Sequence, residues 1–200
     1  MHCMVATKLG TYSTGGYHNA STYISGVKET WFLAKNSYSW ESRPNLMFAR
    51  KEHPCALFAF SNTEVLIVAG GNSEGKALRS TELLILGDDE NGWQPGPLLP
   101  EFVYMRSDTI VSNGESLYLL YSLGNVFYEL RCIESLTNCR WEPLHNVKLR
   151  YPRHWGIALM LPDHMVDMVD CTSTTSMTTS STASTSTSMQ QHKCKLSMLP

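Results

Sequence analysis

The segment 65-VLIVAGGNSEG-75 decides the fold of this chain. An apolar run leads directly into Gly70 and Gly71, and a polar turn follows. A short run rich in Val, Ile and Leu that ends in turn residues predicts a buried β-strand. Two consecutive glycines cost backbone entropy, so the end of this strand must adopt a conformation that requires them.

The composition limits the classes of partner. The chain has 200 residues, which is room for one domain and a tail. Its net charge is −2 and it contains no run of basic residues, so we expect no nucleic acid partner. No apolar stretch reaches the roughly 20 residues that span a bilayer, and no signal peptide is visible at the N-terminus. We expect no membrane span, and the abrupt start also fits a missing upstream region.

Residues 1–166 predict an all-β domain. Short runs of Val, Ile, Leu, Tyr and Phe alternate with Gly, Asn, Pro and Asp at the spacing of hairpins. No segment keeps an apolar period of 3.6 for three turns, so no helix is expected. The expected strands are CALFAF (55–60), EVLIVAG (64–70), STELLIL (80–86), SDTIV (107–111), SLYLLYS (116–122) and VFYELRC (126–132).

Three features recur in the same order at a period of about 50 residues. A glycine pair or a single glycine closes a strand, a tryptophan follows, and an arginine comes after an apolar loop. Recurrence of one feature would be weak evidence for a repeat, but three features that recur in a constant order indicate one. The signature residues are Gly15, Gly16, Trp40, Arg50, Gly70, Gly71, Trp93, Arg106, Gly124, Trp141 and Arg153.

This unit resembles the kelch repeat, which builds one blade of a β-propeller. The resemblance covers residues 8–162 in three copies, roughly 8–60, 61–112 and 113–162, and the second copy is the clearest. It departs from the pattern where Gly124-Asn125 replaces a glycine pair. It departs again where Leu86 stands near the position of the usual tyrosine in the second copy.

The resemblance implies antiparallel four-stranded blades that pack around a channel. The glycines would end strands sharply, each tryptophan would fill space between blades, and each arginine would donate to backbone carbonyls of a neighbouring blade. Three blades are fewer than the four to eight of typical propellers. We therefore expect an open arc, or a piece of a larger propeller, with exposed edges and faces that favour self-association.

The six cysteines leave two interpretations open, buried thiols or at least one disulfide. Cys132 and Cys139 lie across an expected hairpin and are a candidate disulfide. Asn19 belongs to the single N-x-S/T sequon and is a candidate glycosylation site.

A Ser/Thr-rich segment marks a tail over residues 167–200. Between Thr172 and Ser188, fifteen of seventeen residues are Ser or Thr, and none is charged. Such a composition buries no apolar surface, so we expect disorder. The tail is either a passive linker or an O-glycosylated stalk. Because these two interpretations of the tail stay open, the compartment can be cytoplasmic or extracellular.

No motif points to catalysis. His53 and His154 each follow a repeated arginine, where a structural role is expected, and GGNSEG has no Lys-Ser/Thr after it to bind phosphate. We therefore expect no enzyme, cofactor or metal site. The expected function is protein binding through the loops at 72–80, 87–92 and 95–104. The alternative is a secreted or surface protein with a glycosylated stalk, and the partner's identity is open in both cases.

Overall fold

The computed structural model describes residues 2–18, 25–88, 90–100, 109–121, 126–145, 169–172 and 193–196. Throughout these ranges the chain forms β-strands and turns and no helix, so the all-β prediction is confirmed. The chain divides into two units, Met1–Leu159 and Met160–Pro200, which are described separately.

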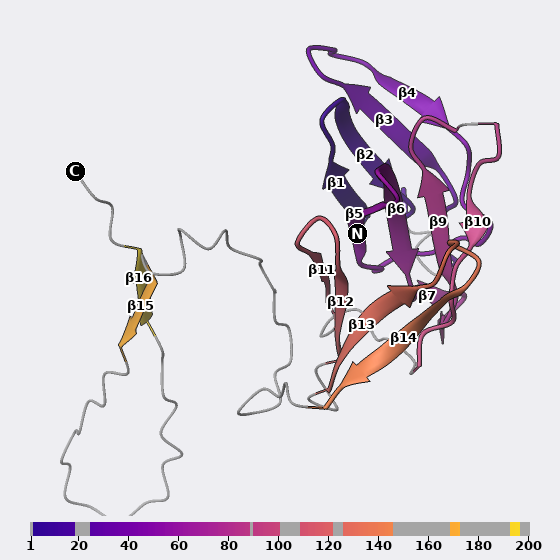
Figure 1. Ribbon diagram of the computed structural model, residues 1–200. Helices are drawn as coiled ribbons and strands as arrows, with labels where there is room; N and C mark the ends of the chain where they lie inside the picture. Colours follow the sequence, from indigo (N-terminus) through magenta and orange to yellow (C-terminus); the bar gives the residue numbers. More distant parts are fainter. Residues whose placement is uncertain are drawn as a thin grey trace, which may run out of the picture. The chain divides into compact units, whose positions relative to one another are not determined.

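The first unit contains three antiparallel four-stranded sheets (Figure 1). Sheet 1 consists of β1 (Cys3–Ala6), β2 (Gly10–Thr14), β3 (Thr30–Ala34) and β4 (Trp40–Arg43). Sheet 2 consists of β5 (Cys55–Phe60), β6 (Thr63–Ala69), β9 (Thr81–Ile85) and β10 (Gln94–Pro95). Sheet 3 consists of β11 (Thr109–Ser112), β12 (Leu117–Tyr121), β13 (Val126–Cys132) and β14 (Cys139–Leu144). A small hairpin of β7 (Asn72–Ser73) and β8 (Lys76–Ala77) projects between β6 and β9.

The sheets are offset from the expected repeat boundaries of 8–60, 61–112 and 113–162. Each sheet starts one strand earlier, so β5 ends the first expected copy but belongs to sheet 2. The reason is the turn at Ser61 and Asn62, whose φ angles are 49° and 66°. Two consecutive residues with positive φ form the tight turn that matches the twist of a hairpin, so β5 pairs with β6.

Sheet 2 is packed on both faces, which explains why the segment 65–69 is apolar without alternation. Val65, Leu66, Ile67, Val68 and Ala69 of β6 are all fully buried. Their side chains alternate between two cores. Leu66 and Val68 pack with residues of sheet 1, and Val65, Ile67 and Ala69 pack with residues of sheet 3.

The first strands of the three sheets lie next to one another in the order β1, β5, β11. A disulfide between Cys3 and Cys55 joins β1 to β5. Among the described residues, no helix is long and apolar enough to cross a membrane.

The second unit contains one described element. Strands β15 (Val169–Thr172) and β16 (Lys193–Leu196) pair antiparallel, with Cys171 opposite Cys194. These strands flank the Ser/Thr-rich stretch inside the segment 167–200 that was expected to be disordered. The rest of that segment lies outside the described residues.

Candidate binding surface

Arg50 lies in the linker that joins sheet 1 to sheet 2, and its side chain is fully buried. Its guanidinium donates hydrogen bonds to the carbonyl oxygen of Gly70 at 2.7 Å and to that of Ser80 at 3.1 Å. It also donates to the Ser80 hydroxyl and forms an ion pair with Glu82. The backbone acceptors are at the end of β6 and before β9. Arg50 therefore ties the linker to the strand ends of sheet 2.

Glu82 is the buried partner of Arg50 and also holds a surface loop. Its carboxylate accepts hydrogen bonds from the backbone N–H groups of Met47 and Phe48. These two side chains point to solvent, and Phe48 is 51% exposed. A buried carboxylate thus fixes the backbone of a loop that presents two apolar side chains.

The charges of Arg50 and Glu82 depend on one another. Burial lowers the pKa of Arg50 from its usual value, while the charge of Glu82 and its hydrogen bond oppose this effect. Removing either partner would leave the other charge buried and unpaired, which costs more than the pair contributes.

His53 lies at the end of the same linker and is 3% exposed. Its Nε2 atom is 3.0 Å from the hydroxyl oxygen of Thr14 in β2. Burial, and secondly the charge of Arg50, lower the pKa of His53 to about 3. His53 is therefore neutral near pH 7.

One glycine in each of the first two pairs is required because the linker passes directly over it. A Cβ at Gly71, where φ is +89°, would be 2.7 Å from the carbonyl oxygen of Lys51 and 2.8 Å from Cβ of His53. A Cβ at Gly15 would be 2.5 Å from the carbonyl oxygen of Arg50 and 2.6 Å from Cε1 of His53. The sequence predicted sharp strand ends at these glycines, and the structure adds the close approach of residues 50–53.

The three repeated tryptophans do not share one environment. Trp93 is buried against sheet 1, and its Nε1 donates to the hydroxyl of Thr30 at 3.0 Å. Trp141 is buried in the core between sheets 2 and 3. Trp40 is 42% exposed, so the prediction that it fills space between sheets is wrong. No sheet of the described residues covers that face of sheet 1.

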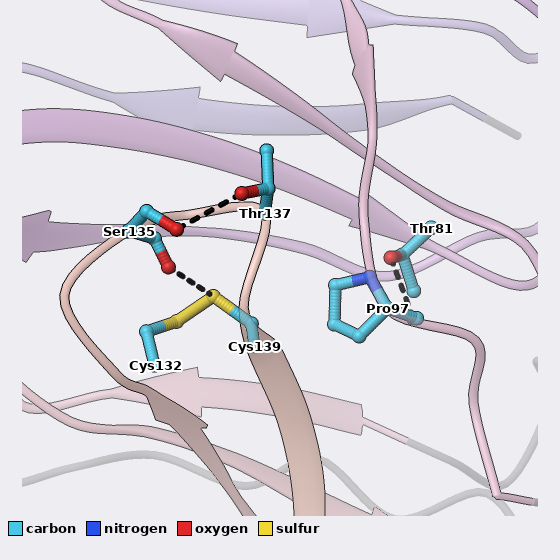
Figure 2. The surroundings of a disulfide bond; sticks show 6 residues. All are labelled: Thr81, Pro97, Cys132, Ser135, Thr137 and Cys139. Carbon is cyan, nitrogen blue, oxygen red and sulfur yellow. Dashed lines mark hydrogen bonds between the residues drawn. A yellow bond between two sulfur atoms is a disulfide. The ribbon is translucent and has the colours of Figure 1, made fainter.

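Two of the three expected binding loops lie together. Arg79, just before β9, donates from Nε to the carbonyl oxygen of Leu99 at 2.8 Å, and the backbone N–H of Leu99 donates back at 2.9 Å. The hydroxyl of Thr81 donates to the carbonyl oxygen of Pro97 (Figure 2). These bonds fix a loop whose Leu98 side chain is 67% exposed.

The third expected loop, 87–92, lies elsewhere. It follows the end of β9, whereas the loops at 72–80 and 96–100 are held at its start. Asp88 and Glu90 of this loop therefore belong to the opposite end of sheet 2. We name the end that carries Met47, Phe48 and Leu98 the linker rim.

One predicted disulfide is present and one was missed. Cys132 and Cys139 are bridged across the turn between β13 and β14, as expected (Figure 2). The Ser135 carbonyl oxygen is 3.7 Å from Sγ of Cys139, a contact only, because a bridged sulfur carries no proton to donate. The Cys3–Cys55 bridge was not predicted, although its separation of 52 residues is close to one repeat.

Four predicted residues lie outside the described residues and stay predictions. They are Asn19, Arg106, Gly124 and Arg153. His154 lies outside them as well.

Comparison with known proteins assigns no family to the chain. No protein-family model matches it. A search of curated proteins found no match either. The kelch resemblance therefore rests on the residues alone.

Proposed function

We propose that this chain is a kelch-type β-propeller segment that acts as a non-catalytic protein-interaction module. Three observations support the blade arrangement: four antiparallel strands in each sheet, cores between successive sheets, and neighbouring first strands. Propeller blades also pack face to face, and they do so around a central channel. The proposal includes no catalysis and no cofactor.

The observation that carries the binding function is the linker rim. Met47, Phe48 and Leu98 are exposed apolar side chains on loops whose backbones are fixed by internal hydrogen bonds. Methionine and aromatic residues are enriched in protein interfaces. A loop that is already ordered loses little conformational entropy on binding, which favours affinity. The linker rim thus fits a protein partner better than a small polar ligand.

The test compares the wild-type chain with variants of the linker rim. Each is immobilised, and proteins from its natural source are identified by mass spectrometry. A partner should be retained by the wild type and lost with Phe48→Ser or Leu98→Ser. Ile133→Ser is the matched control, because Ile133 is 46% exposed in the turn between β13 and β14, at the opposite end of the strands. Equal retention by wild type and Phe48→Ser would refute binding through this rim.

The two disulfides favour a second candidate, a secreted or surface-attached protein. Cys3–Cys55 and Cys132–Cys139 would persist in an oxidising compartment and be reduced in the cytosol. This candidate keeps the interaction module and adds an O-glycosylated stalk in the segment 167–200. The mass of the protein from its natural source decides between the two. Glycan mass on the tail or on Asn19 supports secretion, and an unmodified chain with free thiols excludes it.

A further inference from the structure

Two cysteines of the chain belong to the second unit. All four cysteines of the first unit are used in its two disulfides, which leaves Cys171 and Cys194. Because the first unit has no thiol left to offer, a disulfide of Cys171 within the chain must be made with Cys194.

The backbone of the second unit places these two cysteines opposite each other. Strands β15 and β16 lie side by side (Figure 1), and Cys171 and Cys194 are directly paired in their antiparallel ladder. The Cα atoms of directly opposed residues in such a ladder are about 4.5–5.5 Å apart. Disulfides join residues whose Cα atoms are about 4.4–6.8 Å apart, so this register suits a bridge.

The first unit contains a bridged pair with the same register. Cys132 and Cys139 are directly opposed in the ladder of β13 and β14, and they form a disulfide. The two pairs differ in the chain between them. A short turn joins the strands in the first unit, whereas the segment 172–193, with its Ser/Thr-rich stretch, separates the cysteines of the second unit.

The pairing of β15 with β16 needs more than its backbone hydrogen bonds. An isolated two-stranded hairpin is marginally stable in water, and the entropy cost of closing it rises with the length of the connecting segment. Asp170 and Lys195 occupy paired positions, but one pair of opposite charges stabilises a ladder only slightly. A disulfide offsets the closure cost, because it also holds the strand ends together in the unfolded chain.

We propose that Cys171 and Cys194 form a disulfide within one chain, which closes the segment 172–193 into a covalent loop. The Ser/Thr-rich stretch then lies inside this loop and is not part of a tail that extends freely. The proposal goes beyond the proposed function and depends neither on the linker rim nor on the propeller arrangement. Failure of the bridge would leave both of those proposals untouched.

The oxidant is a small-molecule disulfide such as glutathione disulfide. The thiolate of one cysteine attacks it, forms a mixed disulfide and releases one glutathione thiolate. The thiolate of the second cysteine attacks the sulfur of the first, forms the bridge and releases the second glutathione. Two cysteine thiols are oxidised to one disulfide, and one glutathione disulfide is reduced to two thiols.

The first experiment maps the bridge in the full chain after equilibration with oxidised and reduced glutathione. Remaining thiols are blocked with a maleimide in urea, and cyanogen bromide then cleaves the chain after methionine. Cleavage after Met189 puts Cys171 and Cys194 on different fragments. We expect mass spectrometry to find these fragments joined until a reductant is added, with no maleimide on either cysteine. In Cys171→Ser, Cys194 should carry a maleimide. The intact wild type should stay at 22.5 kDa without reductant.

A variant with a shifted register is the matched control. Cys171→Ser combined with Thr172→Cys keeps the number of thiols and almost the same loop length, but position 172 pairs with Lys193. A shift of one residue moves a side chain to the other face of the ladder, so the bridge should form at an effective concentration about 10-fold lower or less. The ratio of bridged to reduced chain at a fixed glutathione ratio measures this.

Three results would overturn the proposal. The first is a wild type that carries a maleimide on both Cys171 and Cys194 after oxidation. The second is a link from either cysteine to the first unit, or a doubled mass without reductant, which would mean a link between two chains. The third is an equal effective concentration in the wild type and the register variant, because the β15–β16 pairing would then not direct the bridge.

Discussion

Sheets 1 and 2 have the same construction but opposite surroundings. Both have four antiparallel strands, and in both a glycine pair follows the second strand. Trp93 of sheet 2 is 6% exposed, whereas Trp40 of sheet 1 is 42% exposed. The strand pattern therefore decides which face a side chain belongs to. Its burial depends on whether a neighbouring sheet is there to cover that face.

The covered face of sheet 2 differs from the open face of sheet 1 in one further respect. Thr30 and Thr81 each pair with the residue before a glycine pair, so Glu82, which follows Thr81, has the position of Trp31, which follows Thr30. Glu82 is buried because the linker brings Arg50 to it. The pair fixes the linker, and through the linker it fixes Met47 and Phe48. The inter-sheet connection is thus part of the packing of sheet 2 and also positions the candidate binding loop.

The largest effect should come from breaking the Arg50–Glu82 pair. Arg50→Met leaves Glu82 buried without its counter-charge, so we expect about 3–5 kcal/mol less free energy of unfolding. Urea denaturation measures this. The control is Arg140→Met, because Arg140 pairs with Glu142 at the surface and such pairs contribute about 0–1 kcal/mol. If the two variants lose the same stability, the pair does not hold the linker.

The tryptophans give the next test of the comparison between sheets. Trp93→Ala removes a buried side chain and its hydrogen bond to Thr30, so we expect a loss of about 3–5 kcal/mol. Trp40→Ala changes an exposed side chain and should alter stability by no more than about 0.5 kcal/mol in the isolated monomer. Denaturation midpoints at a concentration where the chain is monomeric measure both. Equal losses would mean that Trp40 is also buried in solution.

The sequence predicted the all-β class because its apolar runs are short and bounded by turn residues. It located the glycine pairs and Arg50 because these recur in order. It also located Cys132–Cys139, because a hairpin brings residues close in sequence together. It also predicted that Arg50 donates to backbone carbonyls of a neighbouring sheet, as it does to Gly70 and Ser80, but it did not reveal Glu82 as the charged partner. Glu82 looks like an ordinary polar residue near the start of a strand, and its burial depends on a residue 32 positions away.

The Cys3–Cys55 bridge and the exposure of Trp40 were missed for a related reason. Both depend on how one sheet lies against the next, and local sequence patterns carry little information on packing between sheets. The bridge had a usable signal, because the two cysteines are about one repeat apart. Recognising β1 as the first strand of sheet 1 would have placed Cys3 opposite the next sheet.

The linker that sheets 1 and 2 share should also make stability depend on pH. The pKa of His53 is lowered from 6.5 to about 3 in the folded state, so below pH 6.5 the unfolded chain binds a proton that the folded chain does not. The contribution of neutral His53 to the free energy of unfolding is complete above pH 6.5. It is lost as the pH falls toward 3, by about 1.4 kcal/mol per pH unit. At pH 5 this is a loss of about 2 kcal/mol. Urea midpoints between pH 4 and 8 measure the slope, and His53→Gln should remove this part of it. An unchanged slope in His53→Gln would show that His53 is not the group responsible.

The smallest effect separates the two reasons for a glycine beside the linker. Gly71 and Gly75 both have positive φ, at +89° and +75°, so Ala at either position costs about 1–2 kcal/mol in backbone strain. Only Gly71 lies against the linker, since a Cβ at Gly75 meets nothing within 4 Å. Gly71→Ala should therefore lose about 1–3 kcal/mol more than Gly75→Ala, because the added methyl must displace Lys51 and His53. Matched denaturation curves measure the difference. If it is zero, backbone conformation alone explains the glycine pair, and the linker is held by Arg50 without needing the space that the glycines leave.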